Sequence, residues 1–121
     1  MPRPTILMAE PEPGQALSVR KLVVETAKYN VLTAHSTREA IDLFHLFPNV
    51  SMAIIVGSES TNCEEVGRVI KNTTCKVPLV FLQPQIGAVC MDADHHLPTG
   101  EPEALVELLR AVLGDPRKLT Q

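Results

Sequence analysis

Short apolar segments alternate along this chain with longer segments of helical periodicity, and this alternation constrains the fold more than any other feature. The clearest apolar segment, residues 52–56, contains no polar residue, which suits a strand buried on both faces of a sheet. Apolar side chains in the segments between such strands recur every three or four residues, as in helices that cover a sheet. The sequence therefore predicts an α/β domain in which a parallel sheet carries helices on both faces.

The same pattern places the individual elements. The expected strands span about residues 5–9, 31–34, 52–56, 77–82 and 95–98. The expected helices begin near residues 16, 37, 63 and 102. Residues 83–92 have a poorer pattern, in which Ile86, Ala88, Val89 and Met91 allow a short additional helix although Gly87 opposes it.

Local signals predict where two of these helices begin. Ser36 and Glu39 have the spacing of a capping box, in which each side chain satisfies a free backbone donor of the other residue. Asn62 and Glu65 offer a second cap. The buried side of the second helix is expected to carry Ala40, Ile41, Phe44 and Phe47.

Size and composition fit one domain with one core. The chain has 121 residues, of which 45% are hydrophobic, and we assign residues 1–114 to the domain and 115–121 to a tail or the start of a linker. The formal charge of −3 and the scattered basic residues argue against nucleic-acid binding by this segment. Because no apolar stretch approaches the roughly 20 residues that span a bilayer, and the N-terminus lacks the apolar region of a signal peptide, we expect a cytoplasmic protein without a membrane partner.

The three cysteines give no recognisable pattern. Cys63, Cys75 and Cys90 are odd in number, widely spaced and in no CxxC pair, which argues against both a disulfide framework and a zinc site. They are expected to be small core or surface residues.

Several segments resemble those of one known family. Ile6-Leu7-Met8-Ala9-Glu10 looks like a first strand that ends in an acid, Val77-Pro78-Leu79-Val80 like a proline-marked fourth strand, and residues 93–98 like the segment leading through a fifth strand. With five βα units of this size, residues 5–113 resemble the CheY-like receiver domain of two-component response regulators, a signalling module of phosphorelays. The resemblance implies a flavodoxin-like, doubly wound parallel sheet with strand order 2-1-3-4-5.

The resemblance also implies that the family's phosphoacceptor is missing. A working receiver takes a phosphoryl group from a histidine kinase onto an aspartate after the third strand, assisted by Mg²⁺, a hydroxyl group and a lysine. The aspartate position falls on Val56, or on Gly57 if the register is one residue off, and neither side chain can accept a phosphoryl group. We therefore expect an atypical receiver, a pseudo-receiver with no catalytic residues.

The other positions of that site have changed as well. Glu10 falls at the first metal-binding acid but Pro11 at the second, while Glu12 falls at an acid that is often present but not sufficient. The positions of the hydroxyl group, the lysine and the switch aromatic residue fall on Gln83, Thr99 and His96, in that order. We expect no cofactor, because Glu10 and Glu12 are better explained by the positive end of the first helix dipole than by a weak cation site.

Two polar clusters offer alternatives that we weigh against simpler interpretations. Residues 58–61 contain hydroxyl and carboxylate groups that another enzyme could modify, but a solvated loop that caps the third helix explains them more simply. Asp92, Asp94, His95 and His96 have metal-ligand chemistry. Adjacent histidines on a strand point to opposite faces, however, so a strand edge is the better interpretation than a metal site.

These observations favour a non-enzymatic interaction module. In receivers the face of helix four, strand five and helix five is the usual dimer and partner surface, and here its apolar candidates are Ala88, Val89 and Met91. We expect a protein partner or self-association there, and an output domain that is bound or fused. Two alternatives stay open: a phosphorylatable regulator with a non-standard acceptor, and a flavodoxin-like domain that binds a small molecule.

Overall fold

A five-stranded parallel sheet organises the chain, in the predicted strand order β2-β1-β3-β4-β5. The computed structural model describes residues 4–10, 19–57, 61–74, 76–84, 87–98 and 100–114. Its strands are β1 (Thr5–Ala9), β2 (Asn30–Ala34), β3 (Met52–Val56), β4 (Leu79–Gln83) and β5 (His95–Pro98). The flavodoxin-like α/β fold expected from the sequence is thus confirmed.

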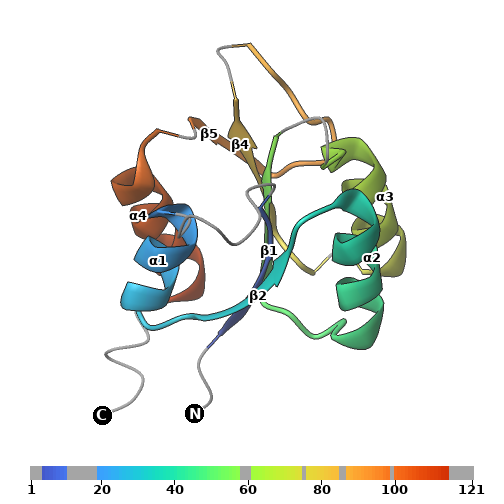
Figure 1. Ribbon diagram of the computed structural model, residues 1–121, viewed down its shortest axis with the longest axis horizontal. Coiled ribbons are helices and arrows are strands. Elements are labelled where there is room, and N and C mark those ends of the chain that lie inside the picture. The colour runs from blue at the N-terminus through green and yellow to red at the C-terminus, as the bar shows by residue number, and fades with distance from the viewer. Residues whose placement is uncertain are drawn as a thin grey trace.

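Four helices in the described part of the chain cover the two faces of this sheet. They are α1 (Val19–Thr26), α2 (Thr37–Leu46), α3 (Cys63–Thr73) and α4 (Pro102–Leu113). α1 and α4 lie on one face, and α2 and α3 lie on the other (Figure 1). None of the helices among the described residues is long and apolar enough to cross a membrane.

The central strands are apolar on both faces, and each face has its own core. Leu7 and Ala9 of β1 belong to the core below α2 and α3, where the Phe44 side chain is fully buried. Ile6 and Met8 alternate with them and belong to the core below α1 and α4. The alternation follows from the pleat, which turns successive side chains of a strand to opposite faces.

Ser36 and Asn62 cap the helices as predicted, through the side-chain half of each cap. Ser36 Oγ accepts a hydrogen bond from the Glu39 amide at 3.2 Å, and Asn62 Oδ1 accepts one from the Glu65 amide at 3.2 Å. The prediction for Phe47 is wrong, because α2 ends at Leu46 and Phe47 leaves the helical backbone as its C-cap. Its side chain is therefore carried away from the buried face and is 48% exposed.

The short helix allowed by residues 83–92 is absent from the described part of that stretch. Residues 87–94, all of them described, form neither helix nor strand, and we call them the 87–94 segment. Gly87 has φ +92°, a left-handed backbone that no helix accommodates. In the described part of the chain, the helix that follows β5 is therefore α4.

The argument against a disulfide is also wrong, since Cys63 and Cys90 form a disulfide bond with their Cα atoms 6.0 Å apart. Both are buried in the core below α2 and α3, as expected for small core residues, and Cys75 lies outside the described residues. The two residues are separated by 27 positions. They meet because the start of α3 and the connection from β4 to β5 lie at the same end of the sheet. Nothing in the local spacing of the cysteines could have indicated this pairing.

Asp94 holds the beginnings of β4 and β5 together. Its Oδ2 atom accepts hydrogen bonds from Lys71 Nζ at 2.6 Å and from the Leu79 amide at 2.8 Å. Partial burial raises the pKa of Asp94. The hydrogen bond from Lys71, the hydrogen bond from the Leu79 amide and the charge of Lys71 together lower it more, so the pKa lies below its ordinary value. The ionised carboxylate is therefore the form that stabilises the fold.

Asp94→Asn should lower the free energy of unfolding by about 1 kcal/mol at neutral pH, a modest value because the carboxylate is partly solvated. A lowered pKa in the folded state gives stabilisation that is complete above about pH 4 and is lost as the pH falls through the folded pKa. The difference between wild type and variant, measured by urea denaturation at several pH values, should therefore shrink in acid. Asp42→Asn is the matched control, because Asp42 pairs with Arg38 at 3.5 Å on an exposed helix surface. An equal loss in both variants would contradict this role of Asp94.

Candidate functional site

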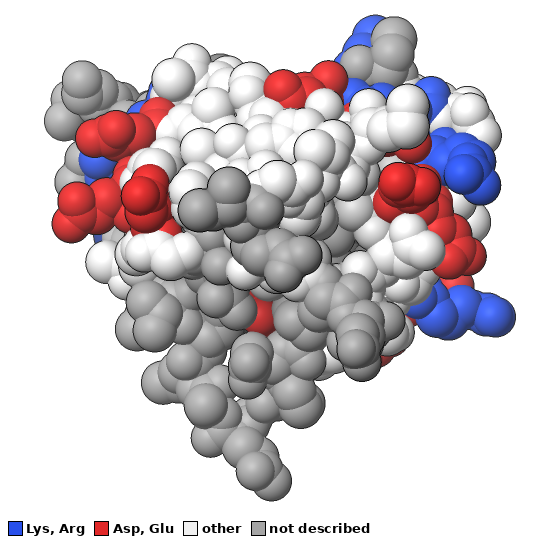
Figure 2. All heavy atoms as spheres, turned by 90° about the horizontal axis from the view of Figure 1, so that it is seen from above, with Lys and Arg blue, Asp and Glu red and all other residues white. Residues whose placement is uncertain are grey.

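The carboxyl ends of the strands form the edge at which parallel α/β sheets place their ligands. Figure 2 looks down on this end of the molecule and shows a broad uncharged area with charged side chains on its flanks. Three candidate residues lie at this edge. Glu10 follows β1 and Gly57 follows β3, each held by a backbone hydrogen bond, and Gln83 is the last residue of β4. Pro11, Glu12 and Thr99, which the sequence also assigned to the site, lie outside the described residues.

Glu10 is held by its backbone and is buried. Its amide donates to the Ala34 carbonyl at 2.7 Å, which extends the pairing of β1 with β2 by one residue. Its own carbonyl lies 2.8 Å from His35 Nδ1. The residue is 1% exposed, so its carboxyl group is enclosed by protein and does not face open solvent. Pro11, at the second metal-binding position of the resemblance, has no side-chain oxygen, and neither has Val56 at the phosphoacceptor position.

The end of β3 carries no group that could accept a phosphoryl group. Val56 is buried in the core below α1 and α4. The Gly57 amide donates to the Leu82 carbonyl at 3.0 Å, and a Cβ atom at this residue would lie 2.7 Å from Pro84 Cδ and 2.8 Å from Phe81 Cε1. The space that a side chain at Gly57 would need is therefore filled by two rings.

Thr61 is the one described residue of the polar loop at 58–61, and it is buried. Its hydroxyl group donates to the Val56 carbonyl, which closes the loop after β3. The residue is 2% exposed, so the expectation of a solvated loop is wrong at this position. A buried hydroxyl that already donates to backbone is a structural group and a poor target for a modifying enzyme.

Gln83 stands where the resemblance expects a hydroxyl group, and it acts as a tether. Its Nε2 atom donates to the Ala88 carbonyl at 2.7 Å. The side chain thus connects the end of β4 to the 87–94 segment.

His96, at the switch aromatic position, is tied to the same segment. Its ring meets the Phe81 ring edge to face, with centroids 5.8 Å apart. Its Nε2 atom lies 3.2 Å from the Cys90 amide nitrogen and 3.1 Å from the Cys90 carbonyl oxygen. The ring can accept from the first or donate to the second, depending on its tautomer. Sequence reasoning missed Phe81 and Cys90 as members of this site, since both look like ordinary core residues.

The polar cluster from Asp92 to His96 does not converge. Asp94 is paired with Lys71, and His96 lies against Cys90. Among the residues that the structure describes, no three His, Cys, Asp or Glu side chains are placed to hold a metal ion.

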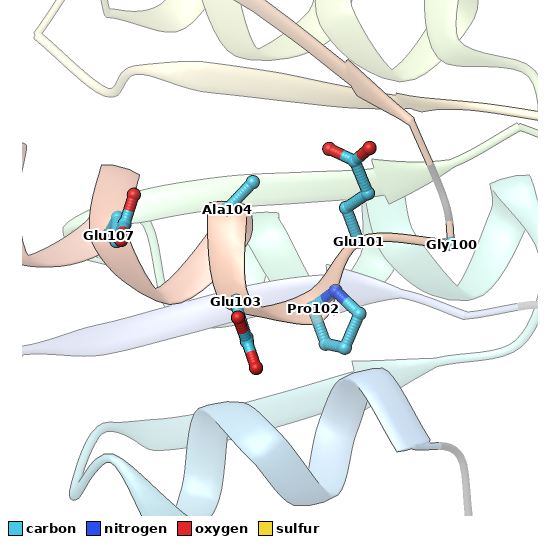
Figure 3. Close-up of a pocket in the computed structure, with 6 residues that line it drawn as sticks. All are labelled: Gly100, Glu101, Pro102, Glu103, Ala104 and Glu107. Carbon is cyan, nitrogen blue, oxygen red and sulfur yellow. The ribbon is translucent and has the colours of Figure 1, made fainter.

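A shallow hollow of about 440 Å³ lies at the start of α4 and also lacks a convergent site. Its acidic residues are Glu101, Glu103 and Glu107. Figure 3 shows that Glu101 and Glu103 point to different sides of the helix start. Divergent carboxylates of this kind form no coordination sphere.

Two large apolar side chains of the 87–94 segment are strongly exposed. Val89 is 62% exposed and Met91 is 85% exposed, while Cys90 between them is 1% exposed. Ala88 is partly buried against the core below α2 and α3. We call Ala88, Val89 and Met91 the contact surface. It lies next to β5, an edge strand of the sheet.

Comparison with known proteins identifies the fold. No family model and no curated protein matches this chain. Among solved structures, a response regulator receiver domain protein from Clostridium thermocellum is 21% identical, with 98% of this chain and 99% of that chain covered and a TM-score of 0.76. The non-phosphorylated HemR receiver domain from Leptospira biflexa is 24% identical, with 92% and 95% covered and a TM-score of 0.72. The receiver domain of the hybrid histidine kinase CckA is 19% identical, with 90% and 98% covered and a TM-score of 0.71. The chain thus has the fold of these receiver domains over nearly its whole length.

Gly57→Ala should lower the free energy of unfolding by about 1–3 kcal/mol, because the rings of Phe81 and Pro84 must move to admit one methyl group. Gly100→Ala is the matched control, since a Cβ atom there meets nothing within 4 Å. The control should change stability by less than about 0.5 kcal/mol. Urea denaturation of both variants makes the comparison. Equal stability of the two would show that the strand end is open and not filled.

Proposed function

We propose that this chain is a receiver-like signalling domain of a two-component system that works through protein contacts and without aspartyl phosphorylation. The observation that carries the proposal is the end of β3. A receiver needs a carboxylate there, whereas this chain has Val56 in the core and Gly57 below the rings of Phe81 and Pro84.

Loss of the other catalytic groups supports the same function. Phosphoryl transfer depends on positioned charges, so a missing cation or metal ligand removes transition-state stabilisation. Gln83 is engaged with the Ala88 carbonyl and has no hydroxyl group. Glu10 is buried, and Pro11 beside it has no side-chain ligand for a metal ion. We infer that Mg²⁺ is no part of this domain's function and that the domain is not an enzyme.

The contact surface supports the interaction part of the proposal. Exposing a methionine and a valine to water is unfavourable, and neighbouring exposed apolar side chains commonly mark sites of protein contact. Val89 and Met91 lie beside the edge strand β5, on the side where receivers carry their partner surface. We infer that a partner protein, a second copy or a fused output domain covers them.

Incubation with acetyl phosphate and Mg²⁺ should add no phosphoryl mass to the chain, as measured by intact-protein mass spectrometry. The physical reason is the absence of an acceptor at Val56 and Gly57. A receiver domain that retains the aspartate, treated in parallel, is the positive control. A labile adduct on any residue of this chain would overturn the phosphorylation-independent mechanism.

The double variant Val89→Ser, Met91→Ser should weaken partner binding or self-association by about tenfold or more, because two apolar side chains no longer leave water on association. Its unfolding free energy should change by less than about 0.5 kcal/mol, since both side chains are already exposed. Leu46→Ser is the matched control, as Leu46 is 70% exposed at the far end of α2. Sedimentation velocity measures self-association, and binding to the immobilised domain measures a partner. Unchanged association of the double variant would remove the contact surface from the proposal.

A further inference from the structure

The Cys63–Cys90 disulfide joins two parts of the chain that are held very differently. On one side Cys63 is the first residue of α3, an eleven-residue helix whose cap is Asn62. Val66 and Ile70 anchor this helix in the core. α3 therefore keeps its own hydrogen bonds and packing whether or not the disulfide is present.

Besides the disulfide, the 87–94 segment on the other side is held by noncovalent contacts. All of its residues are described, and Cys90 alone among them is buried. Ala88 and Ala93 are partly buried against the core, and Asp94 is bonded to Lys71 and Leu79 at the start of β5. Gln83 donates to the Ala88 carbonyl, and the His96 ring lies against the Cys90 peptide. Among these contacts the disulfide is the covalent one, and it joins the middle of the segment to α3.

This anchor also determines which side chains the segment presents. Since Cys90 is drawn into the core, its two neighbours in a non-helical backbone are turned outward, which accounts for the exposure of Val89 and Met91. Release of Cys90 would remove the constraint that holds this arrangement. The state of one covalent bond and the shape of the contact surface are therefore coupled.

We propose that the Cys63–Cys90 disulfide is a reversible thiol switch that sets the conformation of the 87–94 segment and thereby the contact surface. The switch itself is a property of the isolated chain. Its output rests on the contact function proposed above.

The reductant of the switch is a dithiol, and the exchange balances. A thiolate of the dithiol attacks Cys63 Sγ, because Cys63 is 7% exposed whereas Cys90 is 1% exposed. The S–S bond breaks, and Cys90 leaves as a thiolate that takes a proton from water. The second thiol of the dithiol then attacks the mixed disulfide and releases Cys63. Two electrons and two protons pass to the cystine, the dithiol becomes a disulfide, and a disulfide oxidant reverses the reaction.

Both redox states are compatible with the folded domain. Reduced cysteine behaves as a small apolar side chain, so Cys63 can stay in the core as a thiol. Two unbonded sulfur atoms need more room than a bonded pair, so Cys90 must move away from Cys63 on reduction. The ladder between β4 and β5 pairs Val80 with His95 and Gln83 with Pro98, and it does not depend on the disulfide. Reduction should therefore open the 87–94 segment locally and leave the sheet intact.

The test is amide hydrogen exchange of the full chain, followed by mass spectrometry in the oxidised and dithiothreitol-reduced states. Cys75→Ser is introduced throughout, so that a third thiol cannot exchange with the pair. Alkylation should label both cysteines after reduction and neither before it. After reduction, amides of the 87–94 segment should exchange about tenfold faster or more, those of β3 should be unchanged, and oxidised glutathione should restore the slow rate.

Cys63→Ser provides the permanently open state. It should show the exchange pattern of the reduced protein and no response to dithiothreitol. Unchanged exchange in the reduced protein would overturn the proposal, and so would faster exchange across the whole sheet, which would make the disulfide a structural bond. If the Cys63→Ser variant fails to fold while the reduced wild type stays folded, the reduced wild type decides the question.

The failure of the switch and the failure of the contact function are distinguishable. In one outcome, reduction speeds hydrogen exchange of the 87–94 segment but the double variant Val89→Ser, Met91→Ser binds as the wild type does. This outcome supports the thiol switch and overturns the contact function. In the opposite outcome, the double variant binds more weakly but reduction leaves hydrogen exchange unchanged. This outcome overturns the switch and supports the contact function.

Discussion

Parallel pairing of β1, β3 and β4, with apolar side chains on both faces, is the constraint from which the rest of the structure follows. Ile54 of β3, for example, pairs with Met8 of β1 on one side and with Val80 of β4 on the other. Buried backbone groups must be paired, and the ladder pairs them without side chains. The helices that connect the strands then cover the two apolar faces of the sheet. The strand ends are positioned by this core and need no functional group to hold them.

Because the core positions the strand ends, the fold does not require the particular side chains of a receiver's site. The ladder extends past the strands through the Glu10 amide, which donates to the Ala34 carbonyl, and through the Gly57 amide, which donates to the Leu82 carbonyl. At Gly57 the space has been taken by Phe81 and Pro84, and a filled space is a stable alternative to a polar pocket that must keep its groups hydrated or paired.

The sequence predicted what local chemistry determines and missed what long-range contacts determine. The bounds of β1, β3 and β5 were predicted to the residue, because nothing competes with short apolar runs between turn residues. Ser36 and Asn62 were recognised as caps because a cap is a contact across three residues. The Cys63–Cys90 disulfide crosses 27 positions, and its partners carry no spacing signal. At the candidate site, the replaced residues could be identified by resemblance, but the two rings over Gly57 could not.

The absent helix and the missed disulfide both concern the 87–94 segment. The apolar residues around Val89 allow a helix when they are considered alone, but Gly87 has φ +92°, which lies outside the helical region. The backbone turns again after Cys90, where the Ala93 amide donates to the Cys90 carbonyl at 3.1 Å. Cys90 is held in the core by its bond to Cys63, while Val89 and Met91 beside it are exposed. On the thiol switch proposed above, the shape of the contact surface follows the redox state of Cys63 and Cys90, because Cys90 lies between its two exposed side chains.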